Sequence, residues 1–528
     1  MSITYKNREK LWAAILGACM FNAIFWQEKL GINTLFYDVF VVGSVLILYP
    51  QSKNNKAVRW LFLLQSICMV MVIVQNTLLS KIALMLALLT FTAFAQYAHR
   101  SIFFAGGSVI LNTALVWETL LGELKGRKIR SRKKPYVRWA LRLFVPLLLA
   151  VVFFLLYASS NAVFSSIASS IGRQVGRFFD TVFSWFSPGR LLFLAFGFYV
   201  TGWILLRSAR SFFSDQESFY RDTLERFPKL RIGFRRKITG TQTYGSQQKV
   251  KKNMLVLKNE NTKGVLSLVL LNGLLFAVNI IDIIYVWFDL ASNKGVNLSE
   301  AVHEGTGLLI FSILLAMSVL LFFFNGNLNF YKRNKWLQYL SYAWIVQNCV
   351  LVVSVAIRDY YYITRFGLAY KRIGVLFFLL SVLAGLITIF IKILYKKTNY
   401  YLFRINAWVN MSLLVLATLV HWDETMASYN LKHANTTVVD WEFLLSLSGR
   451  ALPVIDKHIY LLDSGKQPGT TDSTARQPNR EGYRKLLAEK EREFLAEQEA
   501  YSWLSWNYSD KAVKDYLQQH PNQVLSNK

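Results

Sequence analysis

Three polar side chains interrupt an apolar run, NGLLFAVNIIDIIYVW, at residues 272–287. Asn272 and Asn279 are seven residues apart, so they lie within about 20° of each other around a helix, and Asp282 lies about 60° further round. Trp287 follows Asp282 by roughly 7–8 Å along the helix axis, and tryptophan is typical of a membrane interface. Ionisable groups in such helices usually serve a site or pair with one another. The stretch therefore predicts a carboxylate near one membrane surface.

Further polar residues are expected to gather around Asp282. His303 and Glu304 begin the next apolar run, and Arg358 and Asp359 end the run after that. Because helices adjacent in sequence often pack together, these side chains should meet at the outer surface. The candidate outward-facing cluster is Asn279, Asp282, His303, Glu304, Arg358, Asp359 and Arg365, with Tyr360, Tyr361 and Tyr362 beside it.

Three interpretations of this cluster stay open. Asp282 could pair with Arg358 or Arg365 and fasten the helices while the tyrosines form an aromatic belt. The cluster could instead bind or translocate a solute, or it could catalyse a reaction. No helical His-Glu-x-x-His spacing accompanies His303 and Glu304, and no phosphate-binding glycine loop is present. We therefore expect no metal and no cofactor, assign no catalytic residue, and do not favour an enzyme.

The elements that position these residues are long apolar helices. More than half of the chain is hydrophobic, and the apolar residues gather into runs long enough to cross roughly 30 Å of hydrocarbon. Residues 77–121 supply either one span plus a partly inserted helix or two spans. The expected fold is an all-α polytopic integral membrane helix bundle with 11 or 12 transmembrane helices. The other predicted spans are residues 11–27, 32–50, 57–75, 139–158, 190–207, 264–288, 305–325, 336–357, 372–395 and 403–421.

The chain divides into three parts by composition. Residues 1–121 are N-terminal transmembrane helices, residues 122–421 form the main transmembrane domain, and residues 422–528 form a small, soluble helical tail. The tail holds 13 Lys/Arg against 15 Asp/Glu, so the excess positive charge belongs to the membrane part. Cys19, Cys68 and Cys349 lie in apolar runs, which argues against a disulfide framework or a thiolate metal site.

The basic residues predict the orientation of the helices. Residues 124–138 carry eight Lys/Arg and no acid, and residues 207–263 carry fourteen Lys/Arg against five acids. Two predicted spans separate these basic loops, so both can lie in the cytoplasm, as the positive-inside rule requires. The same alternation places the tail on the extracytoplasmic side. The basic loops are expected to contact anionic lipid headgroups, and this location of the charge argues against nucleic-acid binding.

The stretch RDYYYITRFGLAYKRIGVLFF (358–378) resembles an uncharacterised bacterial membrane family, domain of unknown function 4173, which has a close relative numbered 4153. Similar proteins carry a Tyr-rich stretch, then Tyr-Gly-Leu-Thr and an Arg; this sequence has Phe366, Gly367, Leu368 and Arg372, with Ala369 in the Thr position. VHEG (302–305), WEFLLSLSGRALP (441–453), WLSWNYSDKA (503–512) and SSNAVF (159–164, with Ala162 where Pro is usual) are also similar. The resemblance implies a polytopic membrane protein and no particular activity.

Two functional hypotheses of different classes follow. The first is a binding, sensing or assembly component of the bacterial envelope, located in the plasma (inner) membrane, with the tail as a possible contact surface for a protein partner. The second is a transporter with an outward-facing polar site around Asp282. A transporter should show polar faces that continue toward the cytoplasm, whereas the polar residues here concentrate near one membrane surface. An intramembrane enzyme is the third possibility.

Overall fold

The computed structural model describes residues 2–124, 187–208, 211–225, 254–289, 298–324, 327–435, 439–462 and 480–520. Within these ranges every extended regular element is a helix, and the β structure is an isolated bridge between Thr223 and Lys397. This confirms the predicted all-α polytopic helix bundle. The predicted span at 139–158 and the basic segment after residue 124 lie outside the described residues.

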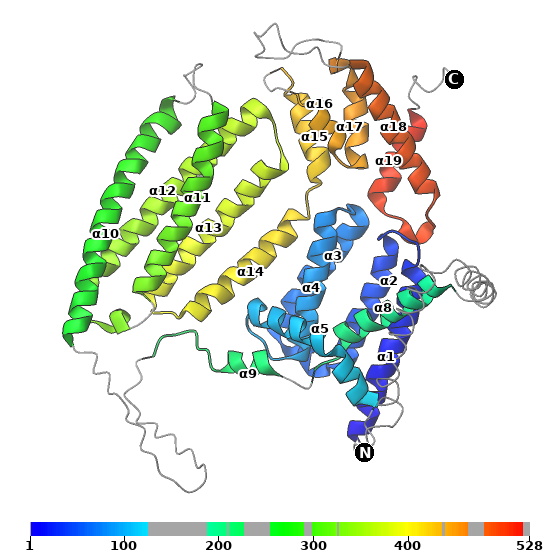
Figure 1. Ribbon diagram of the computed structural model, residues 1–528, viewed down its shortest axis with the longest axis horizontal. Coiled ribbons are helices and arrows are strands. Elements are labelled where there is room, and N and C mark those ends of the chain that lie inside the picture. Colours follow the sequence, from blue (N-terminus) through cyan, green and yellow to red (C-terminus); the bar gives the residue numbers. More distant parts are fainter. Residues whose placement is uncertain are drawn as a thin grey trace, which may run out of the picture.

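Among the described residues, six helices form the N-terminal half of the bundle (Figure 1). In it α1 lies along α8 and α3 lies along α4. Its core includes Val41, Leu61, Phe91, Phe94 and Leu205, which are almost completely buried. The side chain of Asn55 caps α3 and that of Thr77 caps α4, each accepting a backbone N–H that the first helical turn leaves unpaired. The helices are α1 (Ser2–Phe25), α2 (Ile32–Leu48), α3 (Lys56–Val74), α4 (Leu78–Gln96), α5 (Ile102–Leu124) and α8 (Pro188–Leu205).

The described part of the C-terminal half consists of five long helices and one π-helical segment. In it α12 packs against α10, α11 and α13, and α14 packs against α13. Its core includes Leu268, Ile313, Leu320, Leu337 and Leu351, which are almost completely buried. The elements are α10 (Met254–Asp282), η2 (Ile283–Asp289), α11 (Leu298–Phe323), α12 (Lys335–Phe366), α13 (Tyr370–Leu394) and α14 (Asn399–Ala417).

Length and composition identify membrane spans among the described helices. Six are long and apolar enough to cross a bilayer: α3, α4, α8, α10 with η2, α12 and α13. A seventh span is obtained if α14 and α15, which meet at a 62° bend, are counted together. Residues 77–121 contain two helices, and the apolar part of the second, Ile102–Val116, is shorter than a full span. The chain is thus a multi-pass membrane protein, and the total of 11 or 12 spans stays a prediction.

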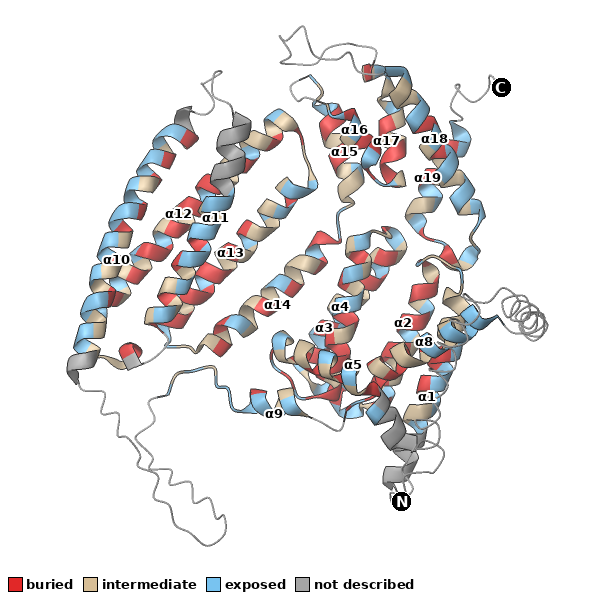
Figure 2. Cartoon of the chain, in the orientation of Figure 1, coloured by how far each residue is buried: buried red, intermediate tan, exposed pale blue. Residues whose placement is uncertain are grey.

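The large apolar side chains on the outside of the bundle agree with this environment. In Figure 2 exposed positions recur along the described parts of α10 and α11. They include Phe322, which is 78% exposed. Contiguous apolar surface of this extent is unfavourable in water and favourable against lipid.

The residues after α14 form a separate helical layer that we call the cap: residues 422–435, 439–462 and 480–520. The cap has its own apolar core, in which Met426, Leu444, Leu452 and Leu487 are buried. Its charged helix at 480–499 agrees with the helical tail expected from the sequence. The cap comprises α15 (Trp422–Lys432), α16 (Trp441–Ser446), η4 (Gly449–Ala451), α17 (Leu452–Lys457), η5 (Ile459–Leu462), α18 (Arg480–Glu499), η6 (Trp503–Ser505) and α19 (Tyr508–Gln519).

The connections between helices gather at two opposite ends of the bundle (Figure 1). The cap lies at one end, the cap end, with the turns at 26–31, 75–77 and 367–369. The other end, the basic end, holds the segments 49–55, 97–101, 206–208, 211–225, 327–334 and 395–398. Between the halves, α14 contacts α13 on one side and α3, α4 and α5 on the other.

Candidate functional site

The predicted polar cluster lies partly within the packed seam between α10 and α12. Asp282 Oδ1 accepts a hydrogen bond from Arg358 Nη2, and the two groups form an ion pair. The Asp282 side chain is 6% exposed and that of Arg358 is 17% exposed. If one of these two side chains were removed, the other charge would stay buried without a partner, which is energetically unfavourable. The structure therefore brings Asp282 and Arg358 together.

The asparagines of the same apolar run contact α12 at regular intervals. Asn272 Nδ2 donates to the carbonyl of Leu340 at 3.1 Å, and seven residues later Asn279 Nδ2 donates to the carbonyl of Gln347, also at 3.1 Å. Trp287 Nε1 donates to Ser354 Oγ at 3.0 Å. The residue numbers of the paired positions increase together along the two helices, so α10 and α12 run parallel. The connecting helix α11 runs in the opposite direction. Such contacts are the usual role of polar side chains between membrane helices.

The remaining predicted residues behave differently. Asp359 is 5% exposed, and its Oδ2 atom has no hydrogen-bond partner within the described part of the chain. Arg365 is exposed near the end of α12. The side chains of His303 and Glu304, on the first turns of α11, lie outside the described residues. The structure thus joins Asn279, Asp282 and Arg358 in one seam, and a binding site that includes all seven residues stays a prediction.

A second polar cluster, which the sequence analysis missed, lies buried at the basic end. His99 Nδ1 is 2.7 Å from Glu217 Oε2, and His99 Nε2 is 2.8 Å from Ser108 Oγ. Glu217 Oε1 accepts hydrogen bonds from the backbone N–H of Ser101 at 2.7 Å and from the Tyr400 hydroxyl at 2.5 Å. These residues come from the α4–α5 turn, from α9 (Phe212–Ser218) and from α14, so one carboxylate ties together three distant parts of the sequence.

The hydrogen bonds that Glu217 accepts change its pKa more than its burial does. Burial by itself would raise the pKa of this carboxyl group, but the hydrogen bonds from His99, from Tyr400 and from the Arg100 backbone N–H lower the pKa below its usual value. The anionic form is therefore the one that the folded protein stabilises. Glu217 was one of five acids in a strongly basic loop, and no spacing rule connects it with His99.

The chain after Glu217 continues this connection as a strap, residues 217–225, along the α13–α14 turn. The backbone N–H of Leu224 donates to the Lys396 carbonyl at 2.9 Å, and that of Thr398 donates to the Asp222 carbonyl at 3.0 Å. Asp222 also forms an ion pair with Arg404 of α14 at 2.8 Å. The strap and the Glu217 cluster together fasten the two halves at the basic end.

At the cap end, the motif that carries the family resemblance docks onto the cap. Asn430 of α15 pairs with the backbone of Leu368: its Oδ1 accepts the N–H at 2.5 Å and its Nδ2 donates to the carbonyl at 3.0 Å. Gly367 has φ +81°, and a Cβ atom there would lie 2.5 Å from Asn430 Oδ1. Arg372 donates to the carbonyls of Phe366 and Gly367, which end α12. These residues thus build a joint between the C-terminal half and the cap.

A second joint links the cap to the N-terminal half at the α1–α2 turn. The Ile32 backbone N–H donates to the Trp506 carbonyl at 2.9 Å, and that of Lys29 donates to Ser505 Oγ at 2.8 Å. Ser505 Oγ in turn donates to Glu28 Oε2 at 2.5 Å. A side chain at Gly31 would meet the Ser505 carbonyl oxygen, 2.4 Å from its Cβ. The WLSWNYSDKA motif therefore seats directly on the membrane domain.

Inside the cap, a buried arginine connects two of the family-like motifs. Arg450 is 8% exposed, and burial lowers its pKa to about 10 despite the opposing influence of Asp510, Glu424 and Asp423. Its Nη2 donates to Asn507 Oδ1 at 3.5 Å, and Asn507 Nδ2 donates to Asp510 at 2.7 Å. The Arg450–Asn507 hydrogen bond therefore links η4 to the start of α19.

The acidic and histidine side chains of these clusters are also the residue types that bind metal ions. Within the described ranges, no group of three or more His, Cys, Asp or Glu side chains lies close enough together to hold a metal ion. Two of the buried acids, Asp282 and Glu217, instead bind an arginine and hydrogen-bond donors of the chain itself.

Comparison with known proteins gives one match. The family model described as Domain of unknown function (DUF4153) matches residues 39–458, which is most of the chain. The match covers the α10–α12 seam, the Glu217 cluster and the first joint of the cap, and it ends before α18. No curated protein and no solved structure matches the chain.

Proposed function

The chain belongs to the DUF4153 family, and from this premise we propose that it is a binding or assembly component of the bacterial envelope, with the cap as its contact surface. We also propose that residues 358–378 relate the chain to the similar family 4173. The observation that carries it is the seating of the cap, which touches both halves of the membrane domain through partly buried polar joints at Leu368 and Ile32.

The proposed location is the plasma membrane, with the cap on the extracytoplasmic side. Support comes from the distribution of charge. The basic end presents Lys53, Lys56, Arg100, Arg221 and Lys332 among its turns, and basic turns favour the cytoplasm. The cap lies at the opposite end of the bundle (Figure 1).

The exposed face of α18 is the best-defined part of the proposed contact surface. Lys485, Glu489, Arg492 and Ala496 are exposed and follow one another at intervals of four, three and four residues, so they share one side of the helix. The opposite side of α18 is buried through Leu487 and Glu491. A partner could therefore bind the exposed side without disturbing the cap core.

The transporter alternative is supported less well by this architecture. Alternating access requires one part of the bundle to move against another. Here the halves are joined through the cap at one end and through the Glu217 cluster and strap at the other. The Asp282–Arg358 pair also fills the place where a solute would meet the carboxylate. An enzyme remains the third alternative, without a catalytic residue to assign.

Complementation of a deletion strain tests the proposal. The double variant Glu489→Lys/Arg492→Glu reverses two surface charges without changing the net charge, so we expect normal abundance in the membrane and loss of complementation. The matched control, Lys511→Glu/Asp515→Lys, also keeps the net charge; it changes exposed residues of α19, outside this face, and should complement. Full activity of the α18 variant would contradict the proposed contact surface. If the α18 variant complements fully while Asp282→Asn, present at normal abundance, does not complement, the transporter would be favoured.

A further inference from the structure

A cleft at the basic end lies between the two halves of the membrane domain. It has a volume of about 730 Å³ and opens to the outside between α3, the α4–α5 turn and α14. Its walls are partly basic and partly apolar, with no Asp or Glu among the lining residues. The lining residues are Asn55, Lys56, Ala57, Trp60, Leu64, Ala98, His99, Arg100, Arg404, Trp408 and Ser412.

The cations of the cleft gather at its entrance. Within the described part of the chain neither Lys56 nor Arg100 has a carboxylate partner; the Arg100 guanidinium donates to the carbonyls of Glu217 and Tyr220. Arg404 is paired with Asp222 through Nη2, but its buried Nε atom has no hydrogen-bond partner among the described residues. The N-terminus of α3, at Asn55 and Lys56, adds the positive end of a helix dipole. The entrance therefore suits an anionic group.

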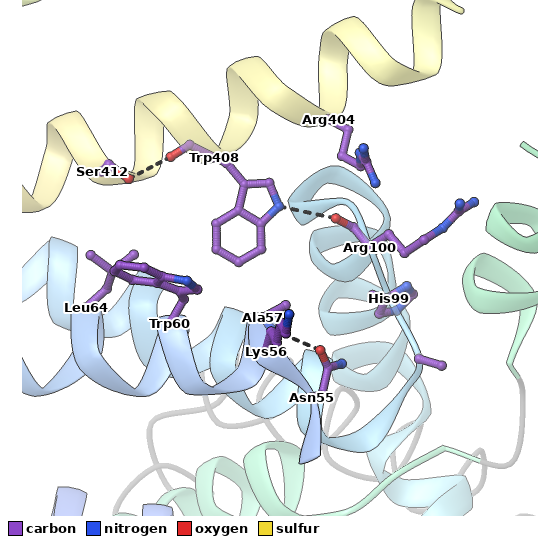
Figure 3. A pocket seen from close by; sticks show the side chains of 11 residues that line it. Asn55, Lys56, Ala57, Trp60, Leu64, His99, Arg100, Arg404, Trp408 and Ser412 are labelled. Atoms are coloured by element: carbon purple, nitrogen blue, oxygen red, sulfur yellow. Dashed lines mark hydrogen bonds between the residues drawn. The ribbon is translucent and has the colours of Figure 1, made fainter. Parts of the chain in front are cut away.

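The deeper part of the cleft is apolar and aromatic. Trp60 and Leu64 follow Lys56 by four and eight residues, or about 6 and 12 Å along α3. Trp408 and Ser412 follow Arg404 by the same intervals along α14. Figure 3 shows the Trp408 indole in the space between the two helices, with Arg100 and Arg404 on one side of it and Trp60 and Leu64 on the other. Trp408 is held there by a hydrogen bond to the Arg100 carbonyl at 3.2 Å.

We propose that this cleft binds one anionic phospholipid, with the headgroup phosphate between Lys56, Arg100 and Arg404 and an acyl chain along Trp60, Leu64 and Trp408. Polarity changes along the cleft in the same direction as it does in a lipid leaflet, from a charged interface to hydrocarbon. Trp60 is 62% exposed, so a bound chain would cover apolar surface that the protein itself leaves open. A soluble phosphate compound would use the cations and leave this surface uncovered.

The position of the cleft gives the lipid a structural role. One wall belongs to α3 of the N-terminal half and the other to α14, which continues into the C-terminal half. His99 of the wall is also part of the buried Glu217 cluster. A bound lipid would bridge the halves beside the strap, so it should stabilise the protein more than lipids elsewhere on the bundle.

Native mass spectrometry of the full-length protein in detergent tests this binding. Dihexanoyl phosphatidylglycerol, dihexanoyl phosphatidylcholine and glycerol phosphate are titrated separately, and the retained molecules are counted. We expect one phosphatidylglycerol to bind at least about tenfold more tightly than phosphatidylcholine, and Lys56→Glu to weaken it by about tenfold or more. Ala57→Phe, which fills the cleft without changing charge, should weaken it similarly. Neither variant touches the strap.

The control variant is Lys53→Glu, which makes the same charge reversal three residues earlier and outside the cleft. It should change the affinity less than twofold. Equal losses in Lys53→Glu and Lys56→Glu would show that lipid binds to general surface charge and would overturn the proposal. Binding of glycerol phosphate as tight as that of phosphatidylglycerol would overturn the choice of a lipid, as would unchanged binding in Ala57→Phe.

Discussion

Individual charges in this protein are stabilised by specific partners. Asp282 and Arg358 illustrate this, because each is largely withdrawn from solvent and the two groups pair between α10 and α12. The sequence identified both residues, and pairing was one of its interpretations. It did not identify Ser354 as the partner of Trp287 or predict the parallel register of α10 and α12, because these depend on how α11 returns between them.

Substitutions of Asp282 and Arg358 should show how strongly the two side chains depend on each other for stability. Asp282→Asn and Arg358→Gln should each lower the free energy of unfolding by on the order of 3 kcal/mol, because each leaves a partly buried charge alone. The apolar pair Asp282→Leu/Arg358→Met should recover most of that loss. Thermal unfolding in detergent gives the comparison. An apolar double variant that is less stable than either single variant would contradict this coupling between the two side chains.

Gly367 is a residue whose backbone conformation decides the docking of the cap. Its φ of +81° is unfavourable for other residues, and a Cβ atom would strike Asn430. Gly367→Ala should therefore lower the melting temperature by several degrees and make the cap more sensitive to limited proteolysis. Gly374→Ala is the matched control, since a Cβ atom at Gly374 meets nothing within 4 Å. If Gly367→Ala and Gly374→Ala have equal melting temperatures and equal sensitivity to proteolysis, the conformation of Gly367 does not decide the docking of the cap.

At the scale of elements, the strap and the turns it binds show what a linear pattern cannot reveal. Long apolar runs predicted the helices well, because the thickness of the bilayer sets their length. The prediction started one helix near residue 264, whereas α10 begins at Met254, since polar residues can extend a helix beyond the hydrocarbon. The Glu217 cluster brings together residues more than a hundred positions apart, for which the sequence holds no local signal.

The strap should also give the protein a defined acid sensitivity. The pKa of Glu217 is lowered in the folded state. The ionised carboxylate therefore contributes fully to the free energy of unfolding above the pKa of an unfolded glutamate, about 4.3. This contribution is lost as the pH falls through the lower pKa of the folded state. Glu217→Gln should melt several degrees lower than the wild type at pH 7, and the difference should shrink below about pH 4.3.

Melting curves measured between pH 7 and pH 3.5 provide the test. Asp215→Asn changes an exposed carboxylate on the same short helix and serves as the control; it should shift the melting temperature little at any pH. A Glu217→Gln difference that stays constant across this range would contradict the assignment of the effect to the ionised carboxylate.

At the scale of the whole molecule, two halves are joined at both ends. The cap bridges them at one end through Leu368 and Ile32, and the strap bridges them at the other. The sequence predicted the boundary of the tail and its helical character from composition. It could not predict that the tail folds back onto the α1–α2 turn, because that contact joins the two extremes of the chain. This seating makes the cap an integral part of the membrane protein.

The most direct test concerns the side of the membrane on which the cap lies. In a variant with Cys19, Cys68 and Cys349 replaced by alanine, single cysteines are introduced by Lys511→Cys in the cap and by Lys53→Cys at the basic end. An impermeant maleimide applied to spheroplasts should label Lys511→Cys directly and Lys53→Cys only after the membrane is permeabilised. Labelling of both positions from the same side, or of Lys53→Cys alone before permeabilisation, would contradict the proposed architecture.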